Sequence, residues 1–259
     1  MYIIAGVGLA WSRVQRFANH GHWLVTVAFL LLLTALITHA RILLGMIVVP
    51  AGLQLSLSNA ASFVGLQLAL IAALGTFESR LRGLCGGLLV LAALLAALTG
   101  AGYSGSPAAS GWQQQAHVLI SLFAYGLLAV GAIVAVFALI QDRRLHSGKL
   151  SSINQLFAPL ETNERLLYGI CAAGFASLFL SVLSGFLFVD NLFAQHLVHK
   201  TVLSLLALLL FGILLAGRQF AGWRGSKAVS LYLWGFTILC LAYFGSRYVL
   251  EIVLGRNWA

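Results

Sequence analysis

Long runs of apolar residues recur along the whole chain, and several exceed the ~20 residues that a helix needs to cross ~30 Å of hydrocarbon. No water bonds the backbone there, so such runs form helices or closed barrel strands. The runs show no period-two alternation, which favours helices. We therefore expect an all-α, polytopic transmembrane bundle of about eight helices, near residues 1–11, 23–44, 60–77, 84–101, 116–140, 166–189, 201–216 and 228–244.

The composition supports the same class. Hydrophobic residues make up 61% of the chain and charged residues only 8%, whereas a soluble domain carries roughly a quarter charged residues. A soluble protein with these residues could not cover its surface. No repeat or domain boundary interrupts the pattern, so we expect residues 1–259 to form one integral membrane domain. The first run has its arginines after the apolar stretch, unlike a secretory signal, and we interpret it as a short helix.

The loop charges predict the topology. Basic residues concentrate in cytoplasmic loops of membrane proteins. Alternate loops of this chain hold eleven of the fifteen Lys and Arg residues, which assigns these loops to the cytoplasm and both termini to the outer side. The cytoplasmic loops are then 12–22, 78–83, 141–165 and 217–227, and the outer segments are 45–59, 102–115, 190–200 and the tail after Phe244.

The net charge of +9 follows from this topology. No basic patch is interleaved with stacking aromatic residues, so we expect no nucleic-acid partner. The cysteines Cys85, Cys171 and Cys240 lie inside apolar runs and form no metal-binding or haem-attachment spacing, so we interpret them as small core or lipid-facing residues.

Histidines carry most of the functional information. His39 ends the second helix, His117 opens the fifth, and His196 and His199 precede the seventh, so all four come near the outer face. Ionisable groups at such depths are functional candidates, and neutral imidazole is a common ligand of haem iron. We predict His117 and His39 as metal ligands, with His199 as a further candidate.

Two alternatives stay open for these histidines. A histidine at a helix end is often an interfacial residue whose ring is satisfied by a hydrogen bond, and this applies to each one taken singly. A zinc site is disfavoured, because no carboxylate or thiolate at that depth completes four ligands. Cationic Lys200 and Arg247 lie at the same level, where they are suited to meeting haem propionates.

Several stretches together resemble a known family. The stretch AHVLISLFAYGLL (116–128) is similar to the segment that carries the first periplasmic histidine in cytochrome c assembly proteins of the CcsA/CcmC type. Four further stretches resemble the HemX/YpjD-type branch of that superfamily: PLETNERLLYG (159–169), HKTVLSLLALLLFGILLAGR (199–218), GWRG (222–225) and LAYFGSRYVLE (241–251). The resemblance implies an eight-helix, haem-handling inner-membrane protein.

The chain also departs from the family pattern. The catalytic members carry a Trp-rich outer segment ending in WDPKE, whereas residues 193–200 read FAQHLVHK. Arg218 stands where those members have a transmembrane histidine, and the stretch FGSRYVLE lacks their second periplasmic histidine. Only His117 therefore matches a haem ligand residue by residue, and His39 and His199 are substitutes chosen by position.

We predict a multi-pass protein of the bacterial inner membrane that binds or handles non-covalent b-type haem and is related to cytochrome c assembly. Its expected partners are the lipid bilayer, haem and cytochrome c biogenesis components. No catalytic motif is present, so we expect no enzyme activity. The alternative is a membrane accessory or regulatory protein that keeps the fold without haem. A small-solute transporter is disfavoured, since no inverted repeat is visible.

The topology prediction can be tested with reporter fusions. A reporter fused after Gly148 should read cytoplasmic and one fused after Ser106 should read periplasmic, because the inner loops hold most of the basic residues. Reporters that fall on the same side would contradict the eight-helix arrangement.

Overall fold

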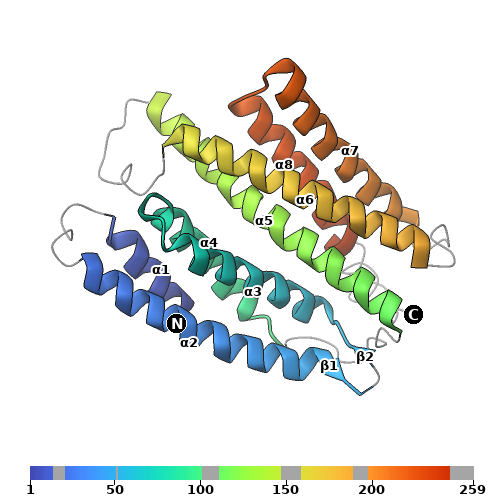
Figure 1. The fold of residues 1–259 in the computed structure, drawn as a ribbon, viewed down its shortest axis with the longest axis horizontal. Helices are drawn as coiled ribbons and strands as arrows, with labels where there is room; N and C mark the ends of the chain where they lie inside the picture. The colour runs from blue at the N-terminus through green and yellow to red at the C-terminus, as the bar shows by residue number, and fades with distance from the viewer. Residues whose placement is uncertain (14–20, 51, 101–110, 147–158, 189–197, 246–259) are drawn as a thin grey trace.

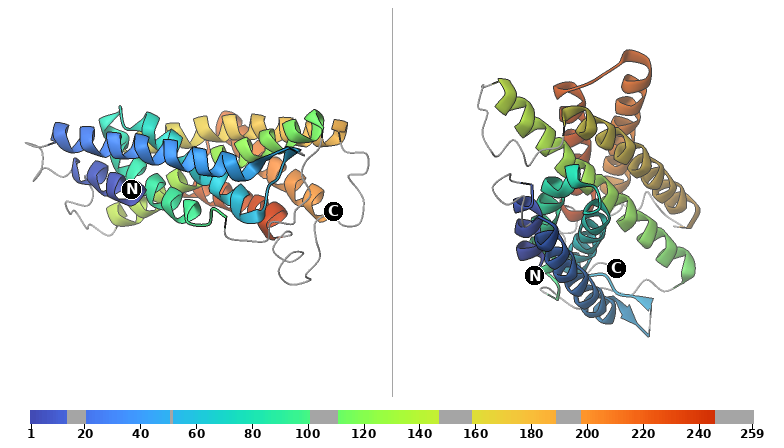
Figure 2. Two further views of the ribbon diagram at one scale, coloured as in Figure 1. Left: turned by 90° about the horizontal axis from the view of Figure 1, so that it is seen from below. Right: turned by 60° about the vertical axis from the view of Figure 1, so that its left-hand side comes forward.

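The computed structural model describes residues 1–13, 21–50, 52–100, 111–146, 159–188 and 198–245. In these ranges the chain forms eight α-helices that run roughly along the long axis of the molecule (Figures 1 and 2). They are α1 (Tyr2–Trp11), α2 (Gly21–Ile47), α3 (Leu57–Gly75), α4 (Arg82–Ala96), α5 (Trp112–His146), α6 (Leu160–Phe188), α7 (Val198–Ala221) and α8 (Ser226–Cys240), which continues into a π-helical turn at Leu241–Gly245.

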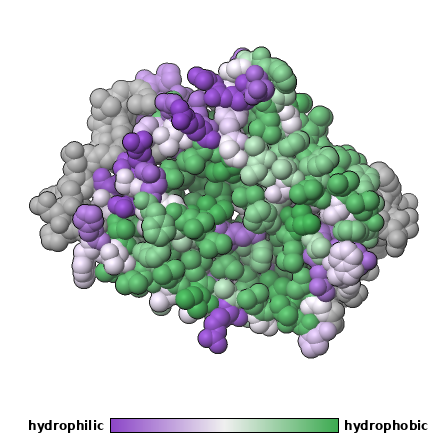
Figure 3. Space-filling view, viewed as in Figure 1, coloured by the Kyte–Doolittle hydropathy of each residue, from purple (hydrophilic) through white to green (hydrophobic). Residues whose placement is uncertain are grey.

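The all-α transmembrane class is confirmed. Seven of the described helices are long and apolar enough to cross a membrane, and α1 is a shorter apolar helix. Each of the eight lies within several residues of its predicted range. The surface seen in Figure 3 is mainly hydrophobic, with hydrophilic residues gathered chiefly along the upper left rim. Which end faces the cytoplasm stays a prediction.

The predicted helix ends need correction in two places. Helix α5 extends beyond 116–140 to Trp112 and His146, because polar side chains let a helix continue past the apolar stretch into the headgroup region. Helix α4 stops at Ala96 rather than near residue 101, and Gly100 adopts a positive φ of 74° shortly after it.

The segment predicted as the outer loop 45–59 also contains structure that the all-α prediction missed. Val48–Val49 (β1) and Gly52–Leu53 (β2) pair as a short antiparallel hairpin, with Val48 opposite Leu53 and Val49 opposite Gly52. Helix α3 begins only four residues after β2, and its first turn is capped by the Ser56 hydroxyl, which accepts a hydrogen bond from the Asn59 backbone N–H.

The bundle has an N-terminal half, α1–α4, and a C-terminal half, α5–α8 (Figure 1). Helices α3 and α5 join the halves, and 61% of the membrane-spanning stretch of each is buried, against 17% for α7. Most buried side chains form one continuous core, and a smaller cluster of Leu43, Ile47, Leu55, Ala60 and Leu122 lies where α2, α3 and α5 meet.

Small residues set the closest helix contacts. Helices α1 and α4 cross at Gly6 and Gly86, where a Cβ on Gly86 would stand 2.9 Å from the Gly6 carbonyl oxygen. On α5, a Cβ on Gly131 would overlap the Tyr232 hydroxyl, which donates a hydrogen bond to the Leu128 carbonyl. Close approach of this kind is how helices associate in lipid.

We predict that Gly131→Val destabilises the fold, because the added methyl groups would displace the buried Tyr232 ring and its hydrogen bond. Overpacking of this kind costs about 1–3 kcal/mol, which thermal unfolding in detergent should show as a lower Tm. The matched control is Gly169→Ala on exposed α6 surface, where nothing lies within 4 Å of the new Cβ. Equal Tm values for the two variants would contradict the packing argument.

Candidate functional site

His39 and His117, two of the predicted outer histidines, lie at one end of the bundle. Helices α2, α4 and α6 end there, and α3, α5 and α7 begin there, at the right of Figure 1. His39 is in the last third of α2 and His117 is in the second turn of α5. The structure therefore brings both imidazoles to the same end of the molecule, as the predicted topology requires.

His39 is buried between α1, α2 and α3. Its Nδ1 lies 3.1 Å from the Tyr2 hydroxyl and its Nε2 lies 2.8 Å from the Ser62 hydroxyl. Ser62 in turn lies 2.6 Å from the Thr99 hydroxyl, which donates to the Ala96 carbonyl. Both ring nitrogens of His39 are thus hydrogen-bonded, and the chain of hydroxyl groups links α1 to the segment that follows α4.

The two hydrogen bonds of the His39 ring limit its use as a metal ligand. One nitrogen of a neutral imidazole donates and the other accepts, so either tautomer uses both nitrogens with these partners. To bind iron, His39 would have to give up its bond to Tyr2 or to Ser62. The network stabilises the contact among four helical segments by pairing polar groups that would otherwise be buried alone.

His117 lies in a second network, between α5 and α6. Its Nδ1 is 2.8 Å from the Ser184 hydroxyl, and its backbone carbonyl accepts a 2.6 Å hydrogen bond from Ser121. The Ser121 hydroxyl also lies 2.7 Å from the Ser181 hydroxyl. Two serines of α6, spaced three residues apart, therefore hold the face of α5 that carries His117.

The His117 face of α5 continues toward the start of α7. Tyr125 lies two turns beyond His117, and its ring centroid is 5.7 Å from that of Tyr243. The Lys200 ammonium lies 5.4 Å from the Tyr243 ring centroid. That Lys200 and His117 belong to one site stays a prediction.

The remaining predicted residues are placed only in part. The backbone of His199 belongs to the first turn of α7, and its side chain lies outside the described structure, as does the whole of Arg247. No described contact joins His39 to His117, because their partners belong to different helices. Among the described residues, no group of three or more His, Cys, Asp or Glu side chains is arranged to hold a metal ion.

Sequence reasoning singled out the imidazoles and missed most of their partners. Tyr2, Ser62, Thr99, Ser181 and Ser184 are hydroxyl residues within apolar segments, and a hydroxyl there is often bonded to its own helix. The i, i+3 spacing of Ser181 and Ser184 was a signal that both occupy one face of α6. Which helix that face meets depends on the tertiary packing.

We predict that Ser62→Ala lowers the stability of the bundle, because it leaves His39 Nε2 without its partner and breaks the link to Thr99. A buried polar group left unpaired costs about 1–3 kcal/mol. Thermal unfolding should show a lower Tm than for Ser177→Ala, whose exposed hydroxyl bonds only the Ala173 carbonyl of its own helix. An unchanged Tm for Ser62→Ala would exclude a stabilising network.

Known proteins similar to this chain can now be compared with the site. The chain is 36% identical over 137 residues to inner membrane protein YpjD of Escherichia coli K12, which covers 53% of this chain and 52% of that protein. It is 29% identical over 141 residues to a 28.8 kDa protein of Azospirillum brasilense from a nifR3-like 5′ region. That match covers 54% of this chain and 52% of the other protein.

The chain spans about half the length of these curated relatives in the matched regions. No solved structure matches it. The seven spans and the inner-membrane relative agree with the predicted localisation as a multi-pass inner-membrane protein. The family described as cytochrome C assembly protein matches residues 23–254, which contain every predicted site residue, and the chain belongs to that family.

Proposed function

We propose that this protein binds and handles haem at the end of the bundle where α5, α6 and α7 meet, with His117 as the residue that would hold its iron. The observation that carries the proposal is the hydrogen bond between His117 Nδ1 and Ser184. Histidines that bind a metal commonly use their second ring nitrogen to donate to a neighbouring acceptor, which fixes the tautomer and the ring orientation. Ser184 is suited to that role and leaves Nε2 for iron.

Aromatic and cationic side chains lie at the same end of the bundle as His117. Trp112 and Phe188, the latter one turn beyond Ser184 on α6, stack edge to face with ring centroids 5.8 Å apart. Lys200, at the start of α7 beside the Tyr243 ring, supplies a positive charge that suits a propionate. When bound, haem would supply its own iron chemistry, and the protein's role is to hold and orient it.

We propose His199 as the second residue that would hold the iron. Its backbone directly precedes Lys200 in the first turn of α7, close to the His117 face of α5. His39 is the less favourable choice, because binding iron would break one of its two hydrogen bonds. We assign His39 to holding α1, α2 and α3 together.

Membership of the cytochrome c assembly family supports a role in delivering or storing haem for cytochrome c. An accessory role without haem is the second candidate. It is favoured by FAQHLVHK at 193–200, which has no Trp-rich haem cradle. The haem content of the purified protein distinguishes the two.

We predict that the detergent-purified protein shows a Soret band and that His117→Ala removes most of its haem, because the axial ligand is lost. Haem per protein, from absorbance of the pyridine complex, is the measurement. The control is His146→Ala, an exposed histidine at the opposite end of α5 that bonds only within its own helix. This variant should keep full haem content.

Ser184→Ala provides a finer test, since it keeps the imidazole and removes the group that orients it. Haem affinity should fall by about 10- to 100-fold, the usual effect of losing such a partner. Full haem content in His117→Ala would overturn the ligand assignment. A wild-type protein that never carries haem would favour the accessory role.

A further inference from the structure

The connection between α7 and α8, at the end of the bundle opposite the histidines, is unusually well organised. Only four residues, 222–225, join the helices, and both glycines in this corner adopt a positive φ of 62°. The Trp223 N–H donates a 3.1 Å hydrogen bond to the Gly217 carbonyl. The Trp223 ring lies so close over Gly217 that a Cβ there would overlap it.

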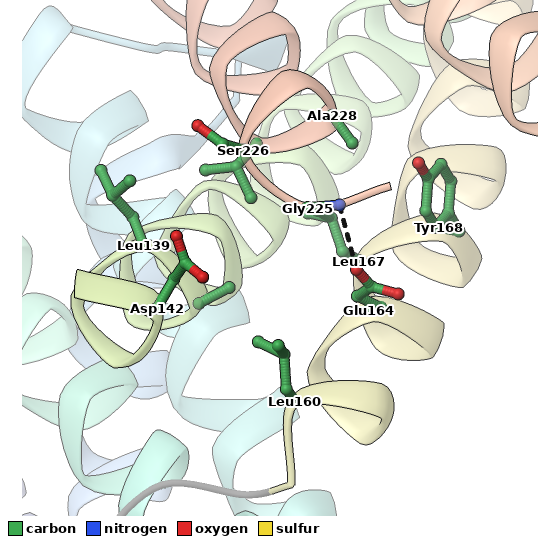
Figure 4. A pocket seen from close by; sticks show the side chains of 11 residues that line it. Leu139, Asp142, Leu160, Glu164, Leu167, Tyr168, Gly225, Ser226 and Ala228 are labelled. Carbon is green, nitrogen blue, oxygen red and sulfur yellow. Dashed lines mark hydrogen bonds between the residues drawn. The ribbon is translucent and has the colours of Figure 1, made fainter. Parts of the chain in front are cut away.

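Two side chains of helix α6 form hydrogen bonds with the backbone of this corner. The Tyr168 hydroxyl donates a 2.5 Å hydrogen bond to the Trp223 carbonyl. The Glu164 carboxylate accepts a 3.0 Å hydrogen bond from the Gly225 N–H, as Figure 4 shows. Glu164 and Tyr168 are one helical turn apart on α6, so a single face of α6 positions the corner.

Arg218 lies inside this arrangement, and no acidic side chain among the described residues pairs with it. Its guanidinium carbon is 4.7 Å from the Tyr168 ring centroid, a cation–π contact. Its Nη1 atom is fully enclosed and has no hydrogen-bond partner among the described residues. Glu164 forms no ion pair with Arg218 in the described structure and instead bonds the Gly225 backbone.

A partly buried guanidinium with no anion is costly, so the arrangement favours an anion supplied from outside the chain. Arg218 as a whole is half-buried. The side chains of Arg224 and Lys227 are exposed in the same segment. The corner thus carries three positive charges, with the Glu164 carboxylate bonded to the Gly225 backbone and the Asp142 carboxylate lining the adjoining pocket.

The position of the corner suggests the kind of anion. Phe220, 88% exposed, and Trp223 place aromatic rings at the end of a transmembrane helix, where such rings mark the headgroup level. The segment 217–227 belongs to the predicted cytoplasmic side. Basic pockets between transmembrane helices on that side recognise acidic lipid headgroups.

We propose that the α7–α8 corner binds the phosphate of an anionic phospholipid, with Arg218 as the anchoring residue. Tyr168 orients the guanidinium by stacking, and Arg224 and Lys227 add positive charge at the rim. Because Nη1 is enclosed, the Nε and Nη2 edge of the planar guanidinium would donate two parallel hydrogen bonds to one phosphate, which an ammonium cannot do. The site is independent of the haem site, since the two lie at opposite ends of the bundle.

The test is thermal unfolding of the detergent-purified protein with added phosphatidylglycerol, compared with phosphatidylcholine of the same acyl chains and with inorganic phosphate. Wild-type Tm should rise with phosphatidylglycerol alone, since a ligand that binds the folded state stabilises it. Arg218→Gln should lower the apparent affinity for phosphatidylglycerol by about tenfold or more, and Arg218→Lys should restore only part of it. Arg80→Gln, an exposed arginine in another loop of the predicted cytoplasmic side, is the matched control.

Should Arg218→Gln fail to fold, the double variant Arg224→Gln/Lys227→Gln changes only exposed side chains and should weaken phosphatidylglycerol binding several-fold. Native mass spectrometry provides a second readout by counting retained lipids. The proposal is overturned if Arg218→Gln binds phosphatidylglycerol as the wild type does. It is also overturned if phosphatidylcholine or inorganic phosphate stabilises the protein equally.

Discussion

Two helices in a bilayer gain nothing from hiding apolar side chains from lipid tails, because the tails are as apolar as leucine. What selects their neighbours is close approach at small residues and the pairing of polar groups. Both mechanisms operate in this bundle. Gly6 meets Gly86 between α1 and α4, and Gly131 leaves room for Tyr232 between α5 and α8. The positions of the histidines and of the α7–α8 corner depend on these contacts.

The same requirement explains the chemistry at the two histidines. A polar side chain inside hydrocarbon needs a partner, and here the partners are hydroxyl groups from neighbouring helices. At His39 they occupy both ring nitrogens, which suits a residue that holds helices together. At His117 the Ser184 hydroxyl contacts Nδ1, which suits a residue that presents Nε2 to a ligand. His39 and His117, which were both predicted as metal ligands, thus have different proposed roles.

The two ends of the C-terminal half are specialised in different ways. At one end, α5, α6 and the start of α7 gather an imidazole, aromatic rings and Lys200. At the other end, α6, α7 and α8 enclose Arg218 beside Tyr168. The sequence resemblance places Arg218 where the catalytic members have a transmembrane histidine, and our second proposal gives this residue an anion to bind.

The sequence by itself determined the fold class, the order of the helices and the end of the bundle at which His39 and His117 lie. These properties follow from hydropathy and bilayer thickness, which act on each segment separately. Only the tertiary structure decided that His39 bonds Tyr2 and Ser62, that His117 bonds Ser184, and that Arg218 has no described acidic partner. The reason is that these contacts depend on the rotation of each helix about its axis and on which helices are neighbours. Both are set by side-chain packing between segments that are far apart along the chain.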